Sequence, residues 1–131
     1  MTDQPPPAIV LNIPAPAPVD EARMLWALVQ VENWDGRTAG RSGEWGPLQI
    51  KPATWRQFSK VPQRRATVEE VQRVALCHLR NCTDGLRRTG LPVTPYWVAL
   101  VWRAGLRNLQ RHTVKREWRN YAERAENCYN R

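Results

Sequence analysis

The sequence predicts a mainly α-helical domain with one small, loop-rich lobe. Apolar residues recur at helical spacing in several segments, and capping and stop signals frame those segments. After residue 19, the Gly-rich stretch 36–51 is the main departure from this pattern. With 131 residues, 42% of them hydrophobic and 24% charged, the chain is long enough for one domain with a real core and too short for two.

The N-terminal half is expected to hold an arm, a helix and a loop. Residues 1–19 contain six prolines, which favour an extended, flexible arm. The folded domain is expected over 20–131, starting at Asp20, a good helix N-cap. A helix over about 20–33 would place Leu25, Leu28 and Val29 on its apolar face. The stretch 36–51 should form a loop with room for a short hairpin.

Four further helices are expected after this loop. Pro52 suits the first turn of a short helix to about residue 60. Thr67 and Glu70 form a capping box for a long helix to about residue 88, stopped by Gly90, with an apolar stripe of Val68, Val71, Ala75, Leu79, Cys82 and Leu86. The apolar run 96–102 predicts a central buried helix starting at Thr94-Pro95. A last helix from about residue 113 would carry on one face Val114, Trp118, Tyr121, Ala122, Ala125 and Tyr129.

The charge balance points to an anionic partner. Twenty Lys and Arg against twelve Asp and Glu give a net charge of +8, which suits nucleic acid, a cell-wall polymer or a membrane surface. No apolar run is long enough to span a bilayer, and the proline-broken start does not resemble a signal peptide, so action at a wall would need a route of export or release that this sequence does not encode. Three cysteines without a CxxC predict neither a disulfide framework nor a metal site. We expect a monomer without a cofactor.

Glu32 is the most informative candidate for chemistry. It follows Leu28 by four residues and Leu25 by seven, so it shares the apolar face of the first helix. Burial favours the protonated carboxyl, and the negative end of the helix dipole acts in the same direction, so both should raise the pKa of Glu32. A carboxylic acid that keeps its proton near neutral pH can serve as the general acid in glycoside cleavage. A glutamate at a frayed helix end, paired with an arginine, is the alternative.

The residues around Glu32 resemble a known family. Glu-Asn-Trp at 32–34 is followed by Gly-Glu-Trp-Gly-Pro-Leu-Gln-Ile at 43–50 and Pro-Ala-Thr at 52–54. This order is similar to that of soluble lytic transglycosylases and goose-type lysozymes, in the lysozyme-like superfamily. Their Ala-Tyr-Asn-Ala-Gly helix end resembles Val-Trp-Arg-Ala-Gly at 101–105, and the tyrosines of their final helix resemble Tyr121 and Tyr129. The resemblance covers about residues 20–131.

The resemblance implies a lysozyme-like fold and cleavage of peptidoglycan glycan strands between N-acetylmuramic acid and N-acetylglucosamine. Glu32 would protonate the glycosidic oxygen and, in the transglycosylase version, then act as the base. Gly46 would let the backbone approach the sugar, and Gln49 would hydrogen-bond near the reacting centre. Trp45 is a candidate for stacking on a sugar ring. The other candidates for substrate binding are Trp102, Arg103 and Tyr121.

Hydrolysis by inversion would need a second carboxylate as the base, and Glu44 ranks ahead of Asp35 for that role. The sequence departs from the family pattern at Asn33, at Pro47-Leu48 and, most seriously, at Arg103. Arg103 could reach Glu32 and lower its pKa, or it could pair with Glu44; the spacing does not decide between them.

Three interpretations therefore stand. The first is a peptidoglycan-cleaving glycosidase, and we prefer it. The second is a catalytically weak or inactive protein of lysozyme-like fold that binds the cell wall or has a structural role. The third is a basic helical nucleic-acid binder, which is disfavoured because no pair of predicted helices makes a helix-turn-helix well.

Overall fold

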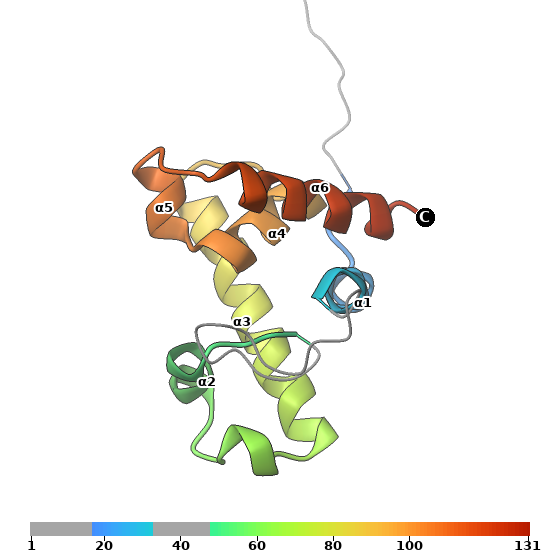
Figure 1. Cartoon of the computed structure of the whole chain (residues 1–131), viewed down its shortest axis with the longest axis vertical. Coiled ribbons are helices and arrows are strands. Elements are labelled where there is room, and N and C mark those ends of the chain that lie inside the picture. The colour runs from blue at the N-terminus through green and yellow to red at the C-terminus, as the bar shows by residue number, and fades with distance from the viewer. Residues whose placement is uncertain (1–16, 33–47) are drawn as a thin grey trace, which may run out of the picture.

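The computed structural model describes residues 17–32 and 48–131, and within these ranges the protein is helical without strands (Figure 1). The elements in chain order are α1 (Glu21–Glu32), α2 (Pro52–Phe58), the 3-10 turn η1 (Gln63–Arg65), α3 (Val68–Arg88), α4 (Pro95–Ala104), α5 (Leu106–Gln110) and α6 (Arg116–Tyr129). The mainly α-helical class is confirmed. Most of the predicted arm and most of the segment proposed for a hairpin lie outside the described residues.

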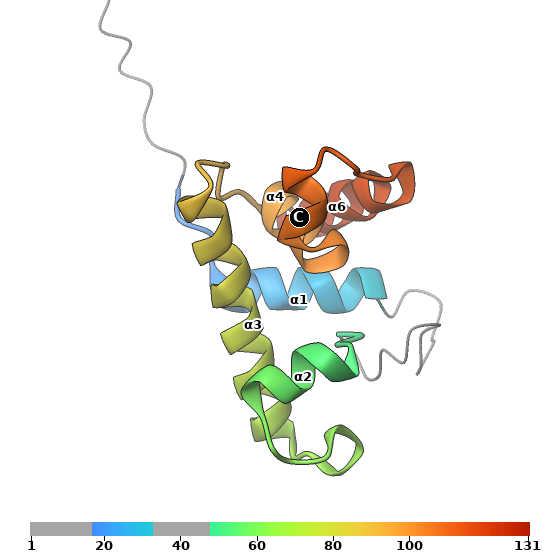
Figure 2. The same cartoon turned by 90° about the vertical axis from the view of Figure 1, so that its left-hand side faces the viewer.

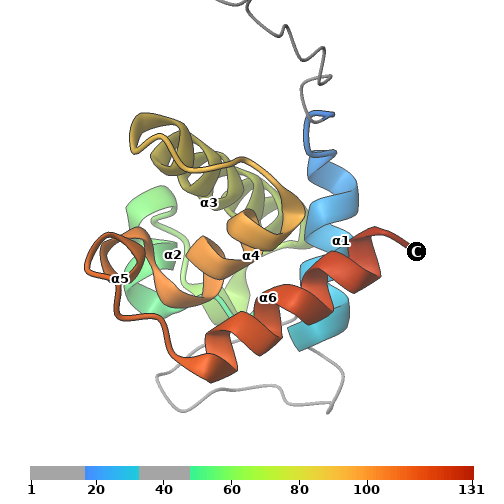
Figure 3. The same cartoon turned by 90° about the horizontal axis from the view of Figure 1, so that it is seen from above.

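The core is built around α4, which packs against α6 and α3, while α1 packs against α6 (Figures 1 and 3). The four residues from Val98 to Val101 are all buried, so the prediction of a central buried helix is confirmed. Long side chains from α1 and α3 complete this core, among them Met24, Leu28 and Leu79, which have no exposed surface. The C-terminal helix therefore holds the N-terminal helix in place.

Local capping explains where the helices begin and end. The carboxylate of Asp20 accepts the N–H of Arg23 at 3.0 Å, and the hydroxyl of Thr67 accepts the N–H of Glu70 at 3.2 Å. Both of these caps were predicted. Gly90 follows α3 with φ of 72°, and Gly105 separates α4 from α5 with φ of 82° and ψ of 147°. These are backbone conformations in which a glycine avoids the strain that a Cβ would introduce.

The structure corrects three details of the sequence prediction. Val68 is not part of the buried stripe: it is the first residue of α3 and is 68% exposed, because the helix begins there before it reaches the core. The last helix begins at Arg116 rather than near residue 113, with Lys115 as its N-cap. The short helix α5 was not predicted, since its five residues are too few to display a period.

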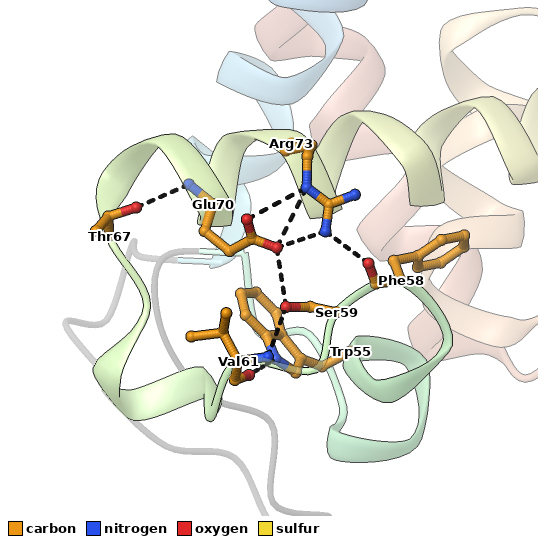
Figure 4. Close-up of polar contacts among 7 residues, drawn as sticks. All are labelled: Trp55, Phe58, Ser59, Val61, Thr67, Glu70 and Arg73. Carbon is orange, nitrogen blue, oxygen red and sulfur yellow. Dashed lines mark hydrogen bonds and ion pairs between the residues drawn. The ribbon is translucent and has the colours of Figure 1, made fainter.

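The segment 50–66 packs against the N-terminal half of α3 (Figures 2 and 4). We call this segment the small lobe. The Trp55 indole is buried and donates to the Val61 carbonyl at 2.6 Å. The Ser59 hydroxyl donates to Glu70 of α3 at 2.9 Å, and Arg73 of α3 donates to the Phe58 carbonyl at 2.6 Å. None of the helices described for this chain combines the length and the apolar character needed to cross a bilayer.

Candidate active site

Glu32 is the last residue of α1 and lies on the face of that helix that packs into the core. Its side chain is only 9% exposed, and among the described residues with ionisable carboxyl, guanidinium or ammonium groups it is the one classed as buried. Buried carboxyl groups need polar partners, because desolvation penalises the ionised form. The predicted burial of Glu32 at the end of the first helix is therefore confirmed.

Tyr121 supplies a polar partner from the opposite end of the chain. Its hydroxyl donates to Oε1 of Glu32 across 2.8 Å, and the tyrosine side chain is itself buried. Tyr121 lies in the middle of α6, whose contact with α1 brings together two residues 89 positions apart. Burial, together with the negative charge of Glu32, raises the pKa of Tyr121 well above its ordinary value. The phenol therefore stays protonated at neutral pH and remains a hydrogen-bond donor.

Arg103 lies near this pair at the C-terminal end of α4. It is half-buried, and its positive charge opposes the rise in the pKa of Tyr121, as does the charge of Arg124. The structure thus gathers Glu32, Tyr121 and Arg103 from three different helices. Glu44, the other partner considered for Arg103, lies outside the described residues, so that pairing stays a prediction.

Trp102, one residue before Arg103 on α4, makes an aromatic contact with α3. Its ring lies against the imidazole of His78 from α3, with ring centroids 4.4 Å apart and planes inclined by 48°. The ring of Phe58, from the small lobe, also lies near His78, with the two ring centroids 6.2 Å apart. Trp102 therefore contributes to the packing between α3 and α4, and because it is only half-buried its proposed role in substrate binding stays a prediction.

Gln49 lies in the turn that leads into the small lobe, between the buried residues Leu48 and Ile50. Its φ of 50° is in the left-handed region, which is strained for a residue with a Cβ and is held by its surroundings. Glu44, Trp45 and Gly46, like Asp35, lie outside the described residues, so their proposed roles stay predictions.

His78 is a residue whose importance the sequence reasoning missed. It is largely buried, its Nδ1 has no hydrogen-bond partner among the residues that the structure describes, and burial lowers its pKa to about 4. A signal was present in the sequence, because His78 falls three residues after Ala75 and four before Cys82 on the apolar stripe of α3. The structure makes it a neutral, aromatic core residue.

The fold and the site define a mainly α-helical protein with a buried carboxyl–phenol pair at the meeting point of its first and last helices. Comparisons of this chain with protein-family models, curated proteins and solved structures gave no match.

Proposed function

We propose that this protein is a peptidoglycan-cleaving glycosidase, a lytic transglycosylase or a muramidase, with Glu32 as the general acid and base. The observation that carries the proposal is the buried hydrogen bond between Tyr121 and Glu32 at the end of α1. The resemblance of the segment from Glu32 to Thr54 to lytic transglycosylases and goose-type lysozymes supplies the substrate, the bond between N-acetylmuramic acid and N-acetylglucosamine.

The chemistry assigns distinct tasks to the two residues. Glu32 would transfer a proton to the glycosidic oxygen as the bond breaks, a role that requires a carboxyl group with little hydration. Tyr121 fixes the direction of that carboxyl group through Oε1. Because the pKa of Tyr121 is raised, its phenol does not compete as the acid near neutral pH. Tyr121 is accordingly a positioning residue in this proposal, rather than the sugar-binding residue that the sequence suggested.

The products decide between the two versions of the reaction. In transglycosylation, the ionised Glu32 takes the proton of the muramyl 6-hydroxyl, which closes a 1,6-anhydro ring. In hydrolysis by inversion, a second carboxylate activates water from about 6.5–9.5 Å away, and Glu44 and Asp35 are the candidates. Anhydro ends on the released fragments would identify the first reaction, and reducing ends would identify the second.

The test is clearing of a peptidoglycan suspension by the purified protein and by Glu32→Gln. The glutamine keeps the size of the side chain and an oxygen that can accept from Tyr121, but it has no proton to transfer. We expect Glu32→Gln to abolish clearing while the thermal unfolding midpoint changes little. Glu123→Gln, which neutralises an exposed carboxylate on α6, is the matched control and should clear like the wild type.

Equal clearing by wild type and Glu32→Gln would remove Glu32 from the mechanism. No clearing by the wild type, combined with firm sedimentation on peptidoglycan, would replace the enzyme by a wall-binding protein.

A further inference from the structure

The positive charges of this protein are unevenly distributed between paired and unpaired side chains. On α3, the guanidinium of Arg80 pairs with Glu21 of α1 at 2.9 Å, and that of Arg87 pairs with Asp84 at 3.1 Å. Arg73 is likewise paired with Glu70. The arginines that recur along the exposed side of α3 are therefore largely neutralised by carboxylates of the protein itself.

The small lobe carries the opposite arrangement. Five basic side chains project from it, all of them exposed and none in an ion pair with another described residue. They are Lys51, Arg56, Lys60, Arg64 and Arg65, and we call the surface that they form the basic lobe. No acidic residue occurs between Lys51 and Val68. Like charges held together on one folded segment repel one another, and an external anion relieves that repulsion.

A second basic group, also without an ion pair to another described residue, lies on the same side of the molecule. No acidic residue occurs from 85 to 116, and exposed basic residues in and after α5 are Arg107, Arg111, Lys115 and Arg116. Figures 1 and 3 both place α5 on the side of the molecule that carries α2. Both groups of exposed basic residues therefore belong to elements on one side of the fold, and the basic lobe is the larger of the two.

We propose that the basic lobe binds a phosphate-bearing polysaccharide of the cell wall. Three of the five groups of the lobe are guanidinium groups, whose planar donor pairs suit phosphate oxygens. All five are exposed on the surface, an arrangement suited to a long chain with repeated charges more than to one small ligand. The choice of a wall polymer rests on the proposed function.

Other polyanionic partners fit the lobe less well. Its exposed large apolar side chain is Val61, and Val68 follows at the start of α3; neither is a tryptophan, phenylalanine or leucine anchor of the kind that interfacial membrane binding uses. Its one tryptophan, Trp55, is buried, and Phe58 is half-buried near His78, so the described part of the lobe offers no fully exposed aromatic face for stacking nucleic-acid bases. The seven residues of α2 make a short helix for reading a DNA groove. A charged polysaccharide requires none of these features.

The test measures binding in the Glu32→Gln background, so that cleavage does not interfere. The probe is isolated wall material that carries its phosphodiester polymer, compared with the same material after acid removal of that polymer. The lobe variant changes Arg56, Arg64 and Arg65 to glutamine. The matched control changes Arg80, Arg87 and Arg88 of α3 to glutamine and so removes the same amount of charge.

We expect the lobe variant to bind the untreated wall about tenfold more weakly, because each exposed charge contact contributes modestly. The control should change binding by less than about twofold, and removal of the phosphodiester polymer should abolish the difference between the variants. Equal weakening by both variants would show that net charge alone is responsible and would overturn the proposal. Tighter binding to duplex DNA or to anionic lipid vesicles than to the wall would overturn it as well.

Two further measurements keep this result separate from the proposed function. Rising salt should weaken binding by the wild-type surface more steeply than binding by the lobe variant, whose folding is checked by its unfolding midpoint. With Glu32 intact, the lobe variant should clear phosphate-free peptidoglycan at the wild-type rate. Absence of clearing by the wild type would contradict the glycosidase proposal while leaving the binding result valid.

Discussion

Tyr121→Phe tests the central contact of the site because it removes one hydroxyl group and keeps the aromatic ring. The ring is 4% exposed in the wild type, so the substitution opens almost no cavity and leaves the apolar packing of α6 in place. The loss is the hydrogen bond of 2.8 Å to Oε1 of Glu32. After the substitution, the buried carboxyl group keeps its desolvation cost but has lost this donor.

The expected magnitude follows from burial. Removing the donor of a buried acceptor costs about 1–3 kcal/mol, so Tyr121→Phe should lower the free energy of unfolding by ~2 kcal/mol. For a domain of this size that corresponds to a fall of roughly 5–10 °C in Tm. Tyr129→Phe is the matched control on the same helix. It removes a more exposed contact, in which the tyrosine oxygen accepts the N–H of Asp20 at 2.9 Å, and should cost less than about 1 kcal/mol.

The assay is urea unfolding at neutral pH of the wild type, Tyr121→Phe, Glu32→Ala and the double variant, because alanine, unlike glutamine, removes the oxygen that accepts from Tyr121. The two single changes should not add, with a coupling of about 1 kcal/mol or more, because they alter the same contact. Tyr121→Phe should also slow peptidoglycan clearing without weakening attachment to the wall. A stabilising role of the buried contact would be refuted if Tyr121→Phe had a free energy of unfolding within about 0.5 kcal/mol of the wild type and if the effects of the two single changes were additive.

Three further predictions concern the frame around the site. Burial lowers the pKa of His78 to about 4, so the unfolded protein takes up a proton at this residue at a higher pH than the folded protein does. The stabilisation is fully present above pH ~6.5, and the free energy of unfolding should fall by about 3 kcal/mol as the pH drops to 4. His78→Leu should flatten this decline, measured as urea midpoints at each pH. Gly105→Ala should cost about 1–3 kcal/mol in thermal unfolding through its backbone angles alone, since an added Cβ meets nothing within 4 Å; a cost below about 0.5 kcal/mol would contradict this. The hydrogen bonds from Arg73 and Ser59 lower the pKa of Glu70, so the stabilisation of the fold by these bonds is present above pH ~4.5 and is lost on acidification. Glu70→Gln should therefore speed amide exchange in the small lobe at pH 7 more than at pH 3.

Helix positions could be predicted where local signals are strong. The cap at Thr67, the stop at Gly90 and the apolar period between them define α3 almost to the residue, and Thr94-Pro95 does the same for the start of α4. The helix α5 was not predicted, because its boundary depends on the backbone angles of Gly105 and on the burial of Leu109, and neither can be read from the local sequence. Val68 was misplaced because periodicity gives the face of a residue and not its distance from the core.

The candidate site could be predicted only in part, for a related reason. The helical period of α1 was enough to place Glu32 on a buried face. The partner of Glu32 depends on how α6 crosses α1, and no local pattern relates residues 89 positions apart. Tyr121 was therefore named as a candidate without its contact. Trp102 was named for its ring, whereas its contact with His78 depends on the packing of α4 against α3.

The arrangement of the molecule also separates cleavage from attachment. Glu32 and Tyr121 belong to the body formed by α1, α4 and α6, whose packing supplies much of the core. The basic lobe belongs to α2 and η1, which pack on α3 and keep their charged side chains in solvent. Tyr121→Phe should thus change stability and turnover, and Glu32→Gln should change turnover. Substitutions at the lobe should change attachment and its salt dependence with Tm almost constant. If the glutamine variant at Arg56, Arg64 and Arg65 lost as much stability as Tyr121→Phe, those arginines would be structural, and the separation of the two surfaces would be wrong.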